Sequence, residues 1–417
     1  MPSTSFGSLT QLNAIGGIEK YLIDSPSLTF WRFQHLKYTN FSVDHVQLPL
    51  SLGSSKANVE IDRQGDLINK MYLQMDLAGL DADSHYVDSI GQMIIKDCVM
   101  NIGGQCVSQF NGAYMYCWEE LSGKEGKLVR EMTGKYSDAD TLKEWSNTAR
   151  RVYVPLPFWF CESSGSALPL IALQFHRVQV KFTWETDLKK LITTGAKISQ
   201  LPGDHVNGAV IAANDQQEPS KLSDLVSNIN LLVSYVYLSQ EERQRFADGS
   251  FEFLITQVQP QEIPDPAKQN QINFNHSAME LIWAVQNPAA VDATNKAEPF
   301  GGHQTGKIEH DTVESIALKF NNHDRVDPDQ PGAYYRLVQP YNHHSRIPQQ
   351  KVYCFSFGLH PEEPQPSGAV NMSRIDKITF SAKTSANNSA ESTFYLWARN
   401  YNVLKIENGL GGQMYAS

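Results

Sequence analysis

The sequence has no segment that would place the protein in a membrane or send it into a secretory route. No apolar run approaches the roughly 20 residues that a membrane-spanning helix needs. The first residues also lack the basic stretch followed by an apolar stretch that defines a signal peptide. We therefore expect a chain that is neither secreted by a signal peptide nor anchored by a helix.

Clusters of basic residues and paired cysteines are lacking as well. The formal net charge is −10 and no run of Lys or Arg occurs, so nucleic acid is not an expected partner. The cysteines form no CxxC pair and their number is odd, which indicates reduced thiols in a chain made in the cytosol. They are Cys98, Cys106, Cys117, Cys161 and Cys354.

Motifs of catalysis and cofactor binding are absent. No Ser or Cys lies in a nucleophile elbow and no P-loop occurs. Histidines gather in the second half, but His343 and His344 are adjacent and lack the His-x-His spacing of a cupin metal site. We expect these histidines to be hydrogen-bonded within loops, residues 323–325 to form an ion-pair cluster, and the protein to have no metal, no cofactor and no enzymatic activity. A cupin-type enzyme is the alternative that bound metal would reveal.

What the sequence does contain is a succession of β patterns. Its 417 residues suit two domains of about 200 residues each, and residues 71–77 and 178–184 alternate apolar and polar side chains as half-buried strands do. No βαβ alternation occurs, so a parallel sheet is not expected. Each half has enough strands for an eight-stranded antiparallel double sheet, which predicts an all-β protein of two tandem jelly rolls with short helices in the loops.

The chain divides at a polar stretch near its middle. We expect an N-terminal arm at residues 1–24, a first jelly roll at 25–212, a linker at 213–228 and a second jelly roll at 229–417. Further expectations concern single elements. They are strands at residues 25–42, 154–161, 167–184 and 229–238, short helical pieces within 111–147, and a helix after Ser239 capped by its hydroxyl together with Glu242.

Residues 321–376 form the segment around which the second half is organised. A short buried strand at 352–359 is bracketed by two loops so rich in Pro, Gly, Asn and His that neither is expected to be helical. Fixed-φ prolines indicate loops that hold one shape. Large, partly polar side chains on such rigid loops are typical of subunit interfaces, and their alternative role is to cap the second sandwich within one chain. The candidates are Tyr334, Tyr335, Tyr341, His343 and Arg346.

Several of these stretches, taken together, resemble one protein family. PGAYYRLVQPYNHHSRIP, followed by PEEPQPSGAVNMSRID, is similar to the C-terminal signature of the major capsid proteins of nucleocytoplasmic large DNA viruses, the phycodnavirus and iridovirus type. The opening strand at residues 25–42, the blocks VPLPFWFC and ALPLIALQFHRVQVKFTW, and the closing residues 400–404 resemble the same family. The resemblance therefore covers nearly the whole chain.

The resemblance implies a structural role in the virion. It implies a double jelly roll whose homotrimer is a pseudo-hexagonal capsomer of an icosahedral shell around a double-stranded DNA genome, usually with an inner membrane nearby. Neighbouring capsomers and minor capsid proteins are the implied partners, and the host cytoplasm is the implied place of synthesis and assembly. The compact loops leave open a minor or specialised capsomer paralogue. A carbohydrate-binding jelly-roll module is the alternative from another class.

Four N-x-S/T sequons occur, at Asn40, Asn275, Asn371 and Asn387. Without a signal peptide, chance explains the first three. Asn387 lies in a polar Ser/Asn/Ala stretch that reads as an exposed loop tip, and it is the candidate glycosylation site.

Overall fold

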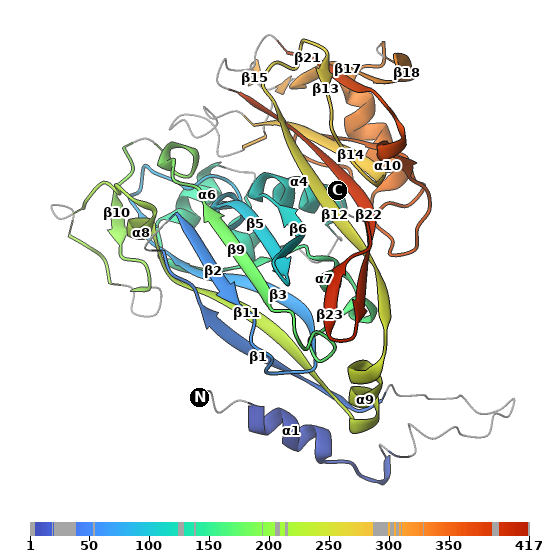
Figure 1. Ribbon diagram of the computed structural model, residues 1–417. Coiled ribbons are helices and arrows are strands. Elements are labelled where there is room, and N and C mark those ends of the chain that lie inside the picture. The colour runs from blue at the N-terminus through green and yellow to red at the C-terminus, as the bar shows by residue number, and fades with distance from the viewer. Residues whose placement is uncertain are drawn as a thin grey trace, which may run out of the picture.

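Antiparallel strands make up most of the structure. The computed structural model describes residues 5–18, 20, 39–52, 55–123, 129–136, 139–193, 195–204, 209–212, 216–286, 299–300, 304–305, 308–309, 311–327, 329–385 and 392–415. Figure 1 shows two sandwiches, the first in blue to green and the second in yellow to red, packed against each other. The predicted all-β architecture of two tandem jelly rolls is confirmed.

The first jelly roll consists of two facing sheets. Its strands are β1 (Phe41–Pro49), β2 (Lys56–Glu60), β3 (Leu67–Leu77), β5 (Ile95–Ile102), β6 (Gln105–Phe110), β7 (Arg150–Pro155), β8 (Leu168–Pro169), β9 (Val178–Trp184) and β11 (Val226–Leu238). One sheet has the order β1-β11-β3-β7, with β8 paired to β3, and the other has the order β2-β9-β5-β6. Met71, Leu73 and Met75 of β3 are buried, as the alternation predicts.

The second jelly roll repeats this plan. Its strands are β12 (Phe251–Ile263), β13 (Asn270–Gln271), β14 (Ser277–Gln286), β17 (Val313–Phe320), β18 (His323–Val326), β19 (Val352–Ser356), β20 (Val370–Asn371), β21 (Ile378–Thr384), β22 (Thr393–Glu407) and β23 (Leu410–Gln413). One sheet has the order β12-β22-β14-β19, with β20 paired to β14 and β23 to β22, and the other has the order β13-β21-β17-β18. Strand by strand, these two orders correspond to those of the first jelly roll.

Small elements lie in the connections. The paired strands are β4 (Gly79–Leu80) with β10 (Ile198–Gln200), and β15 (Gln304–Thr305) with β16 (Ile308–Glu309). The helices are α1 (Ser5–Asn13), α3 (Ile90–Met93), α4 (Gly112–Ser122), α5 (Arg130–Thr133), α6 (Ala139–Ser146), α7 (Trp159–Glu162), α8 (Leu222–Leu225), α9 (Gln240–Asp248) and α10 (Gln339–His343), with the π-helix η6 (Tyr334–Val338) and the 3₁₀ turns η1 (Ser164–Ser166), η2 (Leu188–Lys190) and η7 (Met372–Arg374). The helical pieces predicted within residues 111–147 are therefore present.

Strand β11 corrects the predicted place of one strand. Residues 229–238 were assigned to the second jelly roll, but β11 pairs with β1 from Phe41↔Leu238 to Pro49↔Asn230 and with β3 on its other side. It is thus an inner strand of the first jelly roll, because its apolar side chains complete that sheet. The polar stretch at residues 213–228 leads into this strand, which begins at Val226, instead of separating the two sandwiches.

Proline explains two further corrections. Residues 154–161 were predicted to be a strand, yet β7 ends at Pro155 and the chain then turns into α7, because Pro155 and Pro157 cannot donate ladder hydrogen bonds. The loop before β19 was predicted to contain no helix, yet it forms η6 and α10. Pro340 lies where the π-helix η6 runs without a break into α10, so the missing N–H of the proline coincides with the change in helical hydrogen bonding, and its fixed φ suits the helix.

The N-terminal arm is helical, and the helix predicted after Ser239 is present without its predicted cap. The arm forms α1, which ends before Gly16-Gly17 and packs along β1, with Leu12 against the core. The predicted helix after Ser239 is present as α9, but the Ser239 side chain makes no capping hydrogen bond, so the predicted capping box is wrong. The strand expected at residues 25–42 falls largely outside the described residues, and the described strand begins at Phe41.

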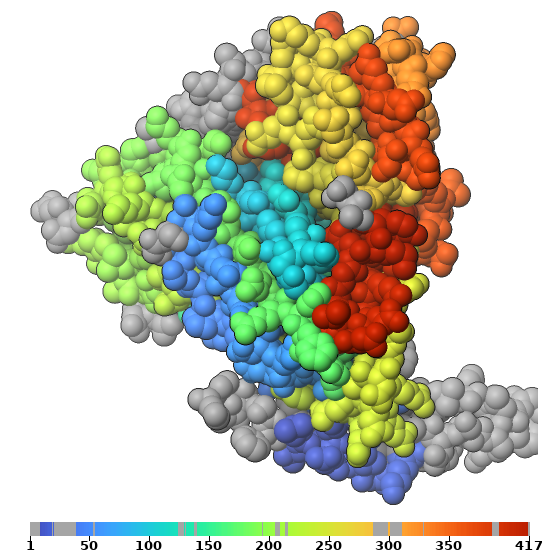
Figure 2. Space-filling model, viewed as in Figure 1, coloured from blue at the N-terminus to red at the C-terminus, as the bar shows by residue number. Residues whose placement is uncertain are grey.

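The two jelly rolls share a hydrophobic core. Ile282, Trp397 and Leu404 of the second jelly roll belong to the same buried cluster as Met75 and Val154 of the first. Figure 2 shows the surfaces of the two halves meeting where cyan β6 adjoins yellow β12. At that line the Gln257 side chain donates a hydrogen bond of 2.6 Å to the Val107 carbonyl. The sheet β12-β22-β14-β19 therefore has hydrophobic residues on both of its faces.

Candidate functional site: the junction of the two jelly rolls

A buried ionic cluster lies at this junction. Glu280 of β14 and Arg399 of β22 lie on adjacent strands, and Arg399 Nη1 donates to Glu280 Oε1 at 2.7 Å. His344, immediately after α10, places Nε2 at 3.0 Å from Glu280 Oε2 and Nδ1 at 3.0 Å from Glu362 Oε1. The side chains of Glu280 and His344 are fully buried and that of Arg399 is 3% exposed. Paired charges of this kind hold a loop onto a strand.

Helix α4 of the first jelly roll covers the cluster. The Arg399 guanidinium lies 3.7 Å from the centre of the Trp118 ring, which is a cation–π contact. The His344 ring approaches the same indole edge-on at 6.2 Å, and Tyr114 packs against Trp397 at 6.1 Å. One face of α4 therefore packs against the second jelly roll.

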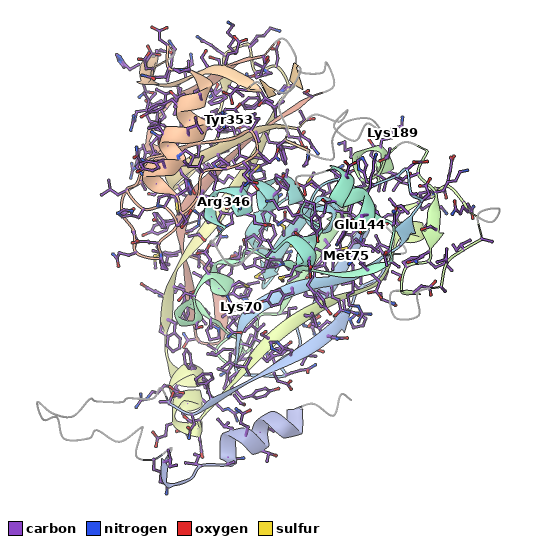
Figure 3. The ribbon with its side chains drawn as sticks, turned by 180° about the vertical axis from the view of Figure 1, so that it is seen from behind. Lys70, Met75, Glu144, Lys189, Arg346 and Tyr353 are labelled. Atoms are coloured by element: carbon purple, nitrogen blue, oxygen red, sulfur yellow. The ribbon has the colours of Figure 1, made fainter. Side chains whose placement is uncertain are left out.

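The loop after α10 is fastened to the end of α4. Glu120 Oε2 accepts hydrogen bonds from the backbone N–H groups of Gln349 at 2.8 Å and Gln350 at 3.4 Å, while its Oε1 lies 2.7 Å from Lys135 Nζ. The Arg346 backbone N–H donates to the Leu121 carbonyl at 3.2 Å. Figure 3 shows Arg346 from behind, where the second jelly roll meets the helices of the first.

The protonation states follow from these neighbours. Burial would raise the pKa of Glu280, but His344 and Arg399 outweigh burial and lower that pKa to about 2. Burial also works against a charged His344 ring, yet its neighbours Cys354 and Glu280 raise the pKa of His344 well above its ordinary value. His344 is therefore an imidazolium held between two carboxylates at neutral pH.

The five residues predicted for a subunit interface lie in different environments. Tyr335 is buried in the core of the second jelly roll, with its ring centre 5.5 Å from that of Trp283. The ring of Tyr334 packs edge-on against the ring of Tyr335. His343 lies beside the Leu359 carbonyl, with its Nδ1 at 2.9 Å, and Arg346 is turned toward the first jelly roll. Tyr341 is 75% exposed. Tyr335 thus caps the second sandwich within its own chain, which was the alternative role considered for these residues. An interface role for the other four stays a prediction.

The sequence carries a signal for this cluster, although none of the predicted sites included it. Glu280 stands inside the apolar run MELIWAV, and Arg399 directly follows the apolar run FYLWA. A single charge in a strand of large apolar residues indicates a buried ion pair, because an unpaired charge there costs too much free energy. Trp118 gave no comparable signal, since its partner lies more than two hundred residues away in the chain.

The remaining predicted sites lie elsewhere. Asn371 is exposed and Asn275 is half-buried, whereas Asn387 lies outside the described residues. In the triplet 323–325, Asp324 pairs with Lys319 at 3.0 Å and Arg325 lies over the ring of Phe355. Within the described ranges, no three His, Cys, Asp or Glu side chains are grouped so that they could hold a metal ion. No helix among those residues is long and apolar enough to cross a membrane.

The fold defines a class of protein, the double jelly-roll capsid proteins. The "PBCV-1 virus capsid, quasi-atomic model" contains a chain with 28% identity and a TM-score of 0.71, covering 93% of this chain and all of that one. The Faustovirus major capsid protein has the same fold at 12% identity, with a TM-score of 0.68 and 97% of each chain covered.

Sequence comparisons define the family. The description "Major capsid protein N-terminus" matches residues 29–239, and "Large eukaryotic DNA virus major capsid protein" matches residues 242–412. The major capsid protein of Pyramimonas orientalis virus is 30% identical over 99% of this chain and 100% of its own length, and that of Paramecium bursaria Chlorella virus 1 is 28% identical over the same shares. The chain belongs to the family of major capsid proteins of large eukaryotic DNA viruses, which is a family of structural proteins and not of enzymes.

Proposed function

We propose that this chain forms a homotrimer that acts as a pseudo-hexagonal capsomer. The observation that carries the proposal is the pair of corresponding jelly rolls in one chain. Three copies of a two-lobed subunit around an axis give six lobes, which is a simple way for a trimer to occupy positions with sixfold neighbours. The likeness over the full length of a chain from a virus capsid supports the same assembly.

The proposed capsomer tiles an icosahedral shell around a membrane-enclosed double-stranded DNA genome. Its partners are neighbouring capsomers and minor capsid proteins, and it is synthesised and assembled in the host cytoplasm. The net charge of −10 supports a shell without direct contact to DNA, because binding to a polyanion needs clustered cations. A minor or specialised capsomer of the same family is the second candidate, supported by the compact length of 417 residues.

Light scattering coupled to gel filtration tests the assembly. We expect a mass three times the chain mass of 46.8 kDa at micromolar concentration. A permanent trimer should bury on the order of 2,000 Å² or more per pair of subunits, so dilution by a factor of ten should not dissociate it. A species that keeps the mass of one chain at every concentration and in isolated particles would contradict the proposal.

A further inference from the structure

Corresponding connections of the two jelly rolls both carry a helix. The sheet orders match when β3, β6 and β7 of the first jelly roll are set against β14, β18 and β19 of the second. The connection from β6 to β7 then corresponds to the connection from β18 to β19. The former contains α4, and the latter contains η6 and α10.

Helix α4 fills a defined space in the second jelly roll. Its Trp118 lies between Arg399 of β22 and His344 at the end of α10. That space is bounded by the second jelly roll's own strands and its own helical connection. Helix α4, from the connection of the first jelly roll, therefore fills the space beside α10, from the corresponding connection of the second jelly roll.

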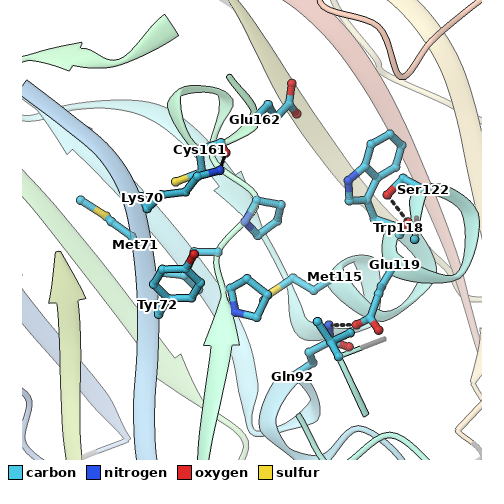
Figure 4. A pocket seen from close by; sticks show the side chains of 15 residues that line it. Lys70, Met71, Tyr72, Gln92, Met115, Trp118, Glu119, Ser122, Cys161 and Glu162 are labelled. Carbon is cyan, nitrogen blue, oxygen red and sulfur yellow. Dashed lines mark hydrogen bonds between the residues drawn. The ribbon is translucent and has the colours of Figure 1, made fainter. Parts of the chain in front are cut away.

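The corresponding space in the first jelly roll is a hollow. It has a volume of about 230 Å³ and lies between β3, α4 and α7 (Figure 4). Tyr72 of β3 and Trp118 and Met115 of α4 line it, with Pro155 and Pro157 between them. In this hollow, β3 of the first jelly roll corresponds to β14 of the second, and α4 corresponds to α10. Aromatic, methionine and proline side chains make the hollow suited to an aromatic group.

The helical connection of the second jelly roll carries exposed apolar side chains. On the other side of η6, Tyr335 is buried in its own core, which fixes the orientation of the segment. The exposed members are Leu337 at 39%, Val338 at 41%, Tyr341 at 75% and Ile347 at 40%, and Leu359, which follows β19, is 65% exposed. Patches of this kind on a rigid surface mark contacts with another protein. Tyr341, the most exposed of them, lies in the connection that corresponds to the one bearing Trp118.

We propose that Tyr341 of one copy of this chain enters the hollow beside Tyr72 and Trp118 of a second copy. The contact joins two different surfaces, and in the proposed trimer three such contacts close into a ring. Tyr341 would then contact the first jelly roll of the second copy in the same way that Trp118 contacts the second jelly roll of its own chain. This inference rests on the proposed trimer and names the residues that join its subunits.

Site-specific photo-crosslinking tests the contact. Tyr341 is replaced by benzoylphenylalanine in the full-length chain, the purified trimer is irradiated, and adducts are mapped by mass spectrometry. Benzophenone reacts readily with methionine, so we expect a product of twice the chain mass with its adduct at Met115, whose side chain points into the hollow. The same group in place of Tyr415, another exposed tyrosine at 57%, should give no adduct there.

A second measurement does not depend on the probe. Tyr341→Ala should raise the trimer dissociation constant about tenfold or more, as loss of an interface aromatic does, and Tyr415→Ala should leave it unchanged. A trimer whose double-mass adducts map away from the hollow overturns the contact but leaves the proposed assembly standing. A chain that is always monomeric overturns both.

Discussion

Glu280 is the residue around which the junction is arranged. Its carboxylate is fully buried, and Arg399 and His344 each contact one of its oxygens. Removing one partner would leave a buried charge unpaired, a change that costs about 3–5 kcal/mol in typical proteins. The three side chains therefore act as one unit, and the charged imidazole of His344 contributes to holding its loop against β14.

The charge on His344 predicts a pH dependence of stability. Because the folded protein holds the His344 proton more tightly than the unfolded chain, this contribution is complete below about pH 6.5, the unfolded pKa. It is lost as the pH rises toward the folded pKa, with a slope of up to about 1.4 kcal/mol per pH unit. Urea unfolding of the wild type and of His344→Gln at a series of pH values should show this slope in the wild type alone.

The neighbouring histidine provides the control. His343 is half-buried and its Nδ1 lies beside the Leu359 carbonyl, away from Glu280. His343→Gln should keep the slope of the wild type. Equal slopes for the wild type and His344→Gln would show that folding does not raise the pKa of His344.

At the scale of elements, α4 is the part of the first jelly roll that holds the second. Trp118→Ala should destabilise the protein, but by less than the roughly 3–5 kcal/mol that loss of a fully buried aromatic costs, because Trp118 is half-buried. It should also raise hydrogen–deuterium exchange in β14 and β22, because Arg399 loses the ring that covers it.

Trp145 is the matched control for this helix. It is 5% exposed and lies 5.6 Å from the Arg150 guanidinium, but wholly within the first jelly roll. Trp145→Ala should destabilise the first jelly roll without raising exchange in β14 and β22. If both variants loosen β14 and β22 to the same degree, α4 has no special role in holding the second jelly roll.

Local patterns predicted most elements and missed those that depend on distant partners. Alternation identified β3 and β9 because one face of each strand packs on the core of its own jelly roll. Composition could not show that β11 pairs with β1, since the choice of partner depends on contacts far along the chain. The α10 helix was missed because proline was treated as a helix breaker at a position where the chain continues from a π-helix into an α-helix. The runs around Glu280 and Arg399 indicate a buried ion pair, but its contacts with His344 and Trp118 were out of reach, because those side chains meet only after both jelly rolls have folded.

For the whole molecule, the shared core predicts how the chain responds to a cut. The proposed division at residues 213–228 places a protease-sensitive stretch just before β11. Cleavage there should leave the fragments bound to each other, since β11 lies between β1 and β3. Gel filtration of the nicked protein should therefore show the mass of the intact species, and only denaturant should release two fragments of roughly 200 residues.

Two results would contradict this expectation. Fragments that separate without denaturant would mean that the first jelly roll is stable without β11. Preferred cleavage within β9 would mean that the boundaries of the first jelly roll are wrong.

The place of β11 in the first sheet also sets the order of events on the ribosome. Strands β1 and β3 are synthesised early, but both wait for the strand that lies between them. At about 5–20 residues per second, β11 follows β3 by on the order of ten seconds. Throughout that interval the nascent chain presents two unpaired strand edges, the kind of surface that chaperones bind and that joins wrongly with other chains. We therefore expect translation speed between Leu77 and Val226 to affect the yield of correctly folded protein.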